Sequence, residues 1–168
     1  DQRAAERLAA WLGKNAAASP YELAAVTILA RKADADVKGA EGDQRRAQQV
    51  EAARIYERLV ELLGDSPEAL TAKKNAVIAN SKLAHYQSEL GDFDGAARRL
   101  QKILVAFPSD RSYLRRAGMA HFQAGQHADA LNQWRTLLAG LEKGSDDWFE
   151  AKYYQLECLR VTDRTAAR

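Results

Sequence analysis

Apolar residues recur along most of the chain at spacings of three and four, and no segment alternates regularly between apolar and polar positions. Spacings of three and four place side chains on one face of an α-helix, whereas a half-buried strand requires a period of two. Alanine, leucine, glutamate, arginine, lysine and glutamine dominate these segments, and all of them favour helix. The pattern therefore predicts an all-α protein.

Short segments rich in glycine, proline, serine and aspartate divide the chain into about eight predicted helices. Ser19-Pro20 and Ser66-Pro67 each place an N-cap residue before a proline at the first helical position. Gly91-Asp92 and Gly125-Gln126 predict tight turns between helices. The remaining breaks are at residues 13–15, 64–65, 108–110 and 144–146. Because most links are short, consecutive helices are expected to pack antiparallel.

Residues 34–43, DADVKGAEGD, are expected to form the one long polar loop. Val37 is the only sizeable apolar side chain in it, so we expect the loop to be mobile, readily cleaved by proteases and tolerant of shortening. Its first residues are weakly similar to a calcium-binding loop. However, Lys38 stands where an oxygen ligand is needed and Arg45 stands where the closing glutamate should be. A solvated loop is therefore favoured over a calcium site.

Two later segments, residues 90–110 and 124–144, have the same pattern of small, bulky and turn residues. Gly91 and Gly125 are 34 residues apart, Ala96 corresponds to Ala130, and Leu100 corresponds to Trp134. A helix pair that repeats with this period is typical of a tetratricopeptide array. Small residues let helices approach closely and bulky residues fill the gaps, so that pairs bury their apolar faces only by stacking.

On these residues the chain resembles the tetratricopeptide repeat family, with the clearest copies at 77–110 and 111–144. The first copy departs from the family pattern at Asn80 and Gln87, where large apolar residues are usual. The second copy keeps Leu114, Ala117, Gly118, Gly125, Ala130, Trp134 and Leu137. A degenerate pair is assigned to 20–63, interrupted by the loop at 34–43. A helix at 67–90, longer than the family norm, follows it, and a terminal helix covers 146–160.

The resemblance implies a single domain over residues 1–168, an all-α, right-handed α-solenoid of antiparallel helix pairs. Because the sequence begins at Asp1 without a methionine and ends abruptly at Arg168, the domain is expected to be one segment of a larger protein. The resemblance also implies a concave groove lined by the first helix of each pair. The groove residues expected to bind a partner are Ser81, His85, Arg115, Met119, Phe122, Phe149, Tyr153 and Leu156.

The last helix is expected to have two different faces. Ala151, Cys158 and Leu159, with Trp148, should face back onto the 126–141 helix. Phe149, Tyr153 and Leu156 are spaced by four and three residues and so share the opposite face. With Met119 and Phe122 they would form the apolar binding end of the groove. The alternative is that these five side chains close on one another as ordinary core between repeats.

Some members of the family hold a C-terminal carboxylate with a lysine and an asparagine one turn apart on the groove helices. The corresponding pairs here are Ser81 with His85 and Arg115 with Met119. The clamp is therefore absent, and binding to the tails of heat-shock chaperones is not supported.

Composition narrows the function further. The 168 residues carry a net charge of +2, which does not favour nucleic-acid or membrane binding by charge alone. The basic segment 111–116 is accordingly interpreted as a solvated face rather than a phosphate site. The single cysteine, Cys158, excludes an internal disulfide. No apolar run is long enough to insert into a membrane.

No motif for catalysis, cofactor binding or metal binding is present. The chain has no glycine-rich phosphate loop, no nucleophile elbow and no paired catalytic carboxylates. His85, His121 and His127 form no ligand cluster, and His121 and His127 are expected in the core or at its boundary. Cys158 has no histidine base beside it in the sequence, so it is interpreted as a structural thiol. The chain is therefore not expected to be an enzyme.

The sequence predicts a non-catalytic protein–protein interaction scaffold that binds a peptide or helix of a partner in its concave groove, without a cofactor. The alternative is a structural or oligomerisation module that positions an attached domain and self-associates through its end helices. A helical repeat that contacts RNA is a third interpretation, which the near-neutral charge disfavours.

Overall fold

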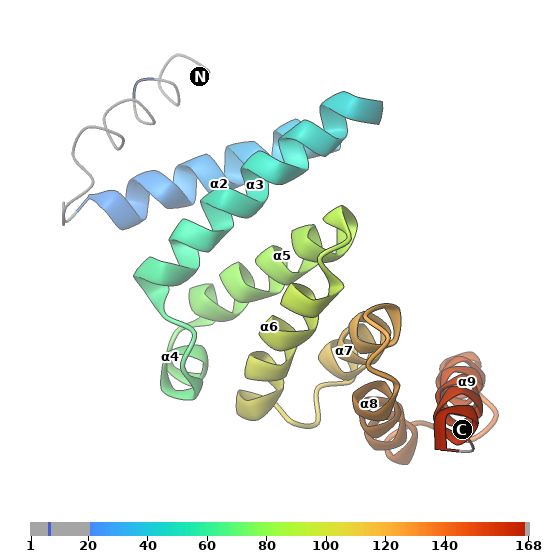
Figure 1. The fold of residues 1–168 in the computed structure, drawn as a ribbon. Coiled ribbons are helices and arrows are strands. Elements are labelled where there is room, and N and C mark those ends of the chain that lie inside the picture. The colour runs from blue at the N-terminus through green and yellow to red at the C-terminus, as the bar shows by residue number, and fades with distance from the viewer. Residues whose placement is uncertain (1–6, 8–20, 167–168) are drawn as a thin grey trace.

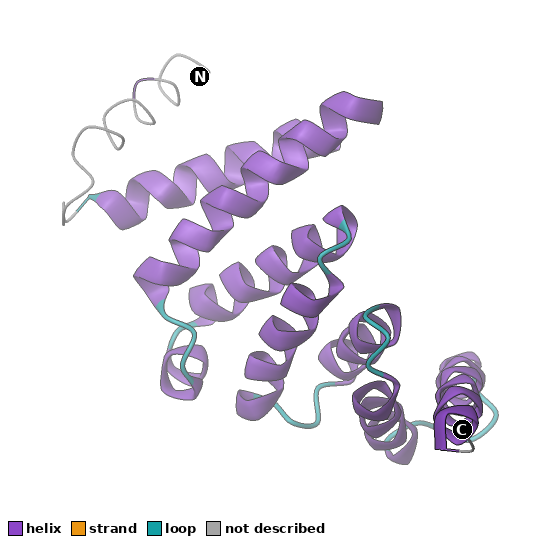
Figure 2. Cartoon of the chain, in the orientation of Figure 1, coloured by secondary structure: helices purple, strands orange, loops and turns teal. Residues whose placement is uncertain are grey.

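The computed structural model of the chain describes residues 7 and 21–166, with side chains described as far as residue 162. The described part consists of helices and links, without a strand, which confirms the all-α prediction (Figure 2). The predicted break at 13–15 and the predicted cap Ser19-Pro20 lie outside the described residues. The helices are α2 (Glu22–Lys38), α3 (Gly42–Leu63), α4 (Pro67–Ala72), α5 (Lys74–Leu90), α6 (Phe93–Ala106), α7 (Arg111–Gln123), α8 (His127–Ala139) and α9 (Asp146–Ala166).

The helices are stacked as successive antiparallel pairs, α2–α3, α5–α6 and α7–α8, and α9 closes the C-terminal end (Figure 1). Each pair packs onto the next through α3 with α5, α6 with α7, and α8 with α9. Short α4 lies beside the stack, against α5 and α6. This order of contacts, in which each pair packs mainly on its neighbours along the chain, is that of an α-solenoid.

Local signals fix most of the helix boundaries. Ser66 caps α4 by accepting a hydrogen bond from the Ala69 amide at 3.3 Å, with Pro67 at the first position of the helix. Asp92 caps α6 in the same way. Gly91 ends α5 with φ +89°, a left-handed conformation that costs glycine little and other residues more. The predicted breaks at these positions are confirmed.

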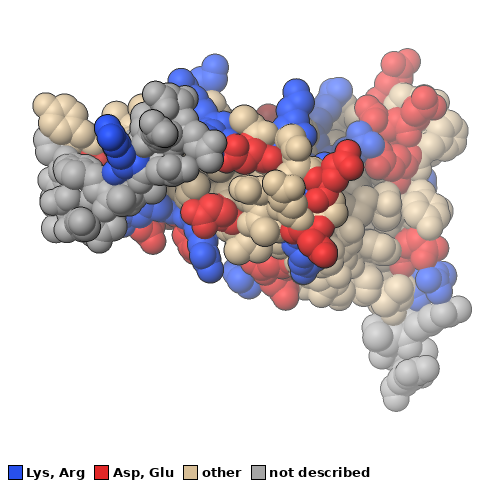
Figure 3. Space-filling view, turned by 90° about the horizontal axis from the view of Figure 1, so that it is seen from above, with Lys and Arg blue, Asp and Glu red and all other residues tan. Residues whose placement is uncertain are grey.

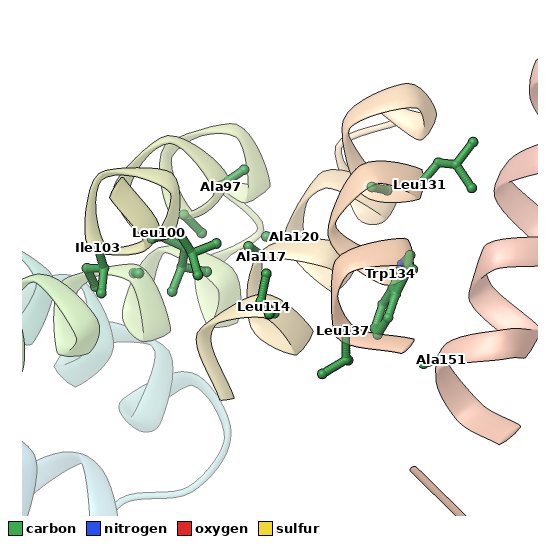
Figure 4. Packing of buried hydrophobic residues seen from close by; sticks show 14 of the residues in the cluster. Ala97, Leu100, Ile103, Leu114, Ala117, Ala120, Leu131, Trp134, Leu137 and Ala151 are labelled. Carbon is green, nitrogen blue, oxygen red and sulfur yellow. The ribbon is translucent and has the colours of Figure 1, made fainter. Parts of the chain in front are cut away.

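Two clusters of buried side chains form the core. One joins α2, α3, α4 and α5, and the other joins α5 to α9. Figure 4 shows the second cluster, where Leu100, Leu114 and Trp134 fill the space between successive helices. Ala96 and Ala130, the small residues of the predicted repeat, are fully buried. Their burial follows from the close approach of helices that only small side chains permit.

The contact of α7 with α8 is closest at Gly118. A Cβ atom at this position would lie 2.7 Å from the Trp134 ring, which is closer than non-bonded carbon atoms approach. The indole of Trp134 therefore packs directly on the α7 backbone. Glycine is required here by the space that the tryptophan occupies, since Gly118 lies inside a helix and not in a turn.

The prediction of a loop at 34–43 is wrong. Helix α2 continues to Lys38 and α3 begins at Gly42, so the link has three residues. Val37 and Ala40 are buried in the contact between the two helices. The aspartate and glycine residues of this segment favour a loop by local preference. Burial of its apolar residues and hydrogen bonds from distant side chains outweigh that preference. The expected mobility and tolerance of shortening have no basis in this geometry.

Asp34 links three helices. Its carboxylate accepts hydrogen bonds from the Tyr56 hydroxyl at 2.9 Å and the Tyr86 hydroxyl at 2.5 Å, and it pairs with Lys82 at 2.9 Å. Partial burial acts to raise the pKa of Asp34, but the bonds from Tyr86, Lys82 and Tyr56 outweigh it and lower the pKa. The same contacts raise the pKa of Tyr56, where burial is the largest cause. Asp34 thus ties α2 to α3 and α5.

Asp34→Asn is expected to lower the free energy of unfolding at neutral pH by about 1–2 kcal/mol, because Lys82 loses its counter-charge and one tyrosine loses a charged acceptor. The folded-state pKa of Asp34 lies below its ordinary value of 3.8. Its stabilisation is therefore present above that value and is lost as the pH falls through the folded-state pKa. Urea unfolding at several pH values measures both effects. Asp36→Asn is the control, because Asp36 pairs only with Lys32 on the same helix; equal losses for the two variants would contradict the account.

The predicted helix at 67–90 is also wrong, because Lys73 breaks it into α4 and α5. Lys73 has extended backbone, with φ −126° and ψ 103°, and its ammonium group donates to the Leu63 carbonyl at 3.2 Å. The break lets α4 turn and bury Leu70 in the core. No glycine or proline marks this position, so the sequence carries no local signal for it. The terminal helix runs to Ala166, six residues beyond the predicted end at 160.

Asn80, which departs from the family pattern, is completely buried. Its amide nitrogen donates to the Ala76 carbonyl at 2.9 Å and to the Gly64 carbonyl at 3.4 Å. Its amide oxygen accepts a bond from Arg99 at 3.1 Å. A polar residue is tolerated at this core position because each of its polar atoms has a partner.

Candidate functional site

The outer face of α9 carries three large apolar side chains that are more than half exposed. Phe149 and Tyr153 are each 59% exposed, and Leu156 is 53% exposed. Their spacing of four and three residues aligns them along one side of the helix. Isolated exposed apolar residues are ordinary on proteins, but three in a row on one helix face make a continuous apolar surface. We call this set the α9 face.

The opposite side of α9 packs on the preceding pair. Ala151 and Cys158 are buried in the core cluster that contains Trp134, and Leu159 packs against that cluster, as predicted. Trp148 is half-buried, with the edge of its ring against Phe149 at 5.2 Å between centroids. The burial of Cys158 raises the pKa of its thiol, which favours the unreactive protonated form.

Tyr154 is the main aromatic contact between α9 and the repeats, and the sequence analysis missed it. Its ring stacks on Trp134 at 5.0 Å between centroids and 13° between planes. It also meets Phe122 edge-on at 5.3 Å. Tyr154 could have been predicted, because it lies three residues after Ala151 and four before Cys158 and so shares the buried face of those two residues.

The predicted set of five apolar groove residues is divided by the structure. Met119 and Phe122 are partly buried and pack against the core cluster, and Phe122 also lies edge-on to His127 at 5.3 Å. Phe149, Tyr153 and Leu156 remain exposed. Neither of the two expected arrangements is therefore complete: two members belong to the core and three form the α9 face.

Arg115 links α7 to the start of α9. Its guanidinium pairs with Asp147 at 3.3 Å and with Glu150. A hollow of about 250 Å³ lies at this junction, lined by Arg111, Ser112, Arg115, Leu137, Leu141, Asp147 and Glu150. The predicted groove residue Arg115 is thus already engaged by two carboxylates, which leaves it less free to bind a partner's acidic group.

Two further hollows lie between the first helices of the pairs. The first, of about 190 Å³, lies between α2 and α5 and is lined by Leu23, Thr27, Ala30, Arg31, Tyr56, Leu59, Leu63, Asn75 and Ile78. The second, of about 310 Å³, lies between α5 and α7 and is lined by Ile78, Ser81, Lys82, His85, Tyr113 and Arg116. Ile78 borders both, so the two hollows adjoin along α5. We call them the α2–α5 hollow and the α5–α7 hollow.

The predicted residues Ser81 and His85 both line the α5–α7 hollow. The Ser81 hydroxyl and carbonyl accept bonds from Arg116 at 2.6 and 2.8 Å. The His85 ring lies 5.3 Å from the Tyr86 ring. Partial burial lowers the pKa of His85, Arg116 and Lys82 lower it further, and Glu89 acts in the opposite direction. The lowered pKa disfavours the charged form of His85.

His121 and His127 lie at the core boundary, as predicted. His121 is buried, and its Nδ1 lies 2.6 Å from Oε1 of Gln126. His127 is half-buried against Phe122. Over the described residues, no three His, Cys, Asp or Glu side chains are grouped so as to hold a metal ion. The described helices also include none with the length and apolar character needed to cross a membrane.

Charges of both signs are interspersed on the face of the molecule shown in Figure 3. No broad basic surface is visible there, which agrees with the net charge of +2. A strong generic attraction for nucleic acid requires basic side chains gathered on one face. The face shown in Figure 3 therefore lacks the charge pattern of a generic nucleic-acid surface.

No protein-family model and no curated protein matches the sequence. Among solved structures, the chain is similar to a Podosopora anserina protein described as a kinesin light chain with nearly identical TPR-like repeats. The identity is 17%, over 96% of this chain and 87% of that one, with a TM-score of 0.49. A single-substitution variant of that protein gives 18% identity over 96% and 86% of the two chains, with a TM-score of 0.47. Because both TM-scores are below 0.5, the assignment of an α-solenoid depends on the helices described above.

Proposed function

We propose that the chain is a non-catalytic scaffold that binds a segment of a partner protein along the groove formed by α5, α7 and α9. Stacked helix pairs of this kind present extended surfaces for other proteins. The proposed contact residues are Ser81, His85, Arg115, Met119, Phe122, Phe149, Tyr153 and Leu156. The α9 face supplies the main apolar contact, and a partner helix or extended segment with apolar side chains is its expected occupant.

The observation that carries this proposal is the exposure of Phe149, Tyr153 and Leu156 together. They share one face of α9, while Tyr154 on the same helix packs against the core. Burying aromatic side chains of this size contributes strongly to association, and aromatic residues are enriched where interfaces gain most of their energy. Met119 and Phe122 contribute from the edge of the core, since both are only partly buried.

Replacing Phe149 and Tyr153 by serine tests the proposal. Both side chains are more than half exposed, so the double variant is expected to keep the melting temperature of the wild type. It is expected to lose capture of the partner protein from extracts of the cell of origin. Val105→Ser is the matched control, because Val105 is also 59% exposed but lies on α6, the second helix of its pair.

Three results would count against the proposal. Unchanged partner capture by the double variant would exclude the α9 face as the binding surface. A large fall in melting temperature would show that Phe149 and Tyr153 are core residues. The third result comes from light scattering. If the mass of the wild type rises with concentration and that of the double variant does not, the self-associating module is favoured instead.

A further inference from the structure

Three of the arginines whose exposure the structure describes are partly buried: Arg58, Arg99 and Arg116. Arg58 pairs with Glu22, and Arg99 pairs with Asp65 at 3.5 Å. Arg116 has no carboxylate partner among the described residues. Among the described residues, its guanidinium donates to the hydroxyl and the carbonyl of Ser81 and lies over the Tyr113 ring. A sheltered positive charge without a counter-charge is costly, so the missing partner of Arg116 calls for an explanation.

Arg116 lines the α5–α7 hollow, which is about 310 Å³ in volume and open to the groove side of α5. Burial lowers the pKa of Arg116, and the Tyr113 ring, whose centroid lies 5.8 Å from the guanidinium carbon, offsets only part of that cost because it carries no full negative charge. Of the other basic side chains in the hollow, Lys82 is already paired with Asp34 at 2.9 Å, and partial burial lowers the pKa of His85. A guanidinium carries five N–H donors, and the two bonds to Ser81 leave others free for an incoming acceptor.

We propose that the α5–α7 hollow binds a carboxylate side chain of an acidic partner segment, with Arg116 as its counter-charge. This inference rests on the proposed function, because it supposes that a partner polypeptide lies along the groove. The planar guanidinium of arginine matches a carboxylate with two parallel hydrogen bonds. Ser81 holds the guanidinium in place, which reduces the entropy lost when the carboxylate binds.

The surroundings of Arg116 favour a polypeptide over a nucleic acid. Asp34 and Glu89 place negative charge near His85, and its repulsion is greater for a chain of closely spaced phosphates than for a single carboxylate. Ile78 is 45% exposed and separates the hollow from the apolar α2–α5 hollow. A segment with a carboxylate beside an apolar side chain could therefore contact Arg116 and Ile78 together, which a phosphate backbone cannot do.

Nuclear magnetic resonance of the full chain tests the inference with two peptides, acetyl-Leu-Glu-Leu-amide and acetyl-Leu-Gln-Leu-amide. The glutamate peptide is expected to shift the backbone amide signals of Ser81, His85 and Arg116 at millimolar concentration. The glutamine peptide, which has the same shape without the charge, is expected to bind about tenfold more weakly. Raising the salt concentration is expected to reduce the difference between the peptides.

Variants at Arg116 connect the effect to this side chain. Arg116→Gln is expected to bind both peptides equally, whereas Arg116→Lys, which keeps the charge but not the planar fork, is expected to retain part of the difference. Arg98→Gln is the control, because Arg98 is exposed on α6 and lies outside the hollow. Melting temperatures show that each variant is folded, and Arg116→Lys keeps the test valid if Arg116→Gln is unstable.

Equal affinities of the two peptides for the wild type, or no shift with either, would overturn the inference. If Arg116→Gln still binds the glutamate peptide more tightly than the glutamine peptide, the inference is also overturned, because another residue must then distinguish the two peptides. Stronger shifts of the same amides by a ten-nucleotide oligothymidylate would favour a nucleic-acid site instead. The proposed function fails separately: a Phe149 and Tyr153 double variant that captures its partner normally would exclude the α9 face while leaving the peptide result intact.

Discussion

Trp134→Ala is expected to lower the free energy of unfolding by about 3–5 kcal/mol, the range for removing a large buried aromatic side chain. The indole is completely buried, stacks on Tyr154 at 5.0 Å and packs on the backbone of α7 at Gly118. Its removal leaves a cavity between α7, α8 and α9 that the rigid helices cannot fill. Urea or guanidinium unfolding of the wild type and the variant measures the loss.

Trp148→Ala is the matched control, because it removes the same side chain from a half-buried position at the start of α9. Its expected cost is less than half that of Trp134→Ala, since less of the ring is withdrawn from water. Similar losses for the two variants would mean that the stack of Trp134, Tyr154 and α7 does not hold the C-terminal helices together.

Ala96→Trp and Ala130→Trp are each expected to cost about 3 kcal/mol, near the upper end for overpacked sites. Both alanines are completely buried where helices approach closely. An indole cannot fit there unless the helices separate, which would break the stacking of successive pairs.

Ala128→Trp is the control for these two variants, because Ala128 lies on the exposed side of α8. It is expected to change the stability by about 0.5 kcal/mol or less. Thermal unfolding followed by circular dichroism compares all three. Normal melting of the Ala96 and Ala130 variants would show that the repeat alignment is wrong.

Helix ends and turns could be predicted from the sequence because their causes are local. Ser66 caps with its own hydroxyl, Asp92 caps with its own carboxylate, and Gly91 adopts a left-handed conformation at the end of its own helix. Each of these signals lies within a few residues of its effect. The small residues Ala96 and Ala130 could also be placed in the core, because the repeat relates them to each other.

The errors concern residues whose structure depends on distant partners. Aspartate and glycine favour loops locally, which predicts a loop at Asp34. In the structure, contacts of its carboxylate with Tyr56, Lys82 and Tyr86 stabilise Asp34 inside a helix. The helix break at Lys73 allows Leu70 to reach the core, but no glycine, proline or other local signal in the sequence predicts this break. Local preference is a weak determinant compared with burial and long-range bonds.

The candidate site shows the same division. The exposure of Phe149, Tyr153 and Leu156 follows the helical period, so the sequence could place them on one face. Whether Met119 and Phe122 join them depends on how α9 docks, and its docking is set by Tyr154 against Trp134. Arg116 could not be singled out as the unpaired charge, because its sheltered position becomes evident only once α5 and α7 are brought together.

Photo-crosslinking from Tyr153 tests the central claim, that the α9 face binds a partner protein, most directly. Benzoylphenylalanine replaces Tyr153 in one chain and Val105 in another, two positions of equal exposure on different helices, and both chains are irradiated in the cell of origin. We expect an adduct with another protein from position 153 and none from position 105. Equal crosslinking at the two positions, or an adduct from 153 that contains only a second copy of this chain, would contradict the claim.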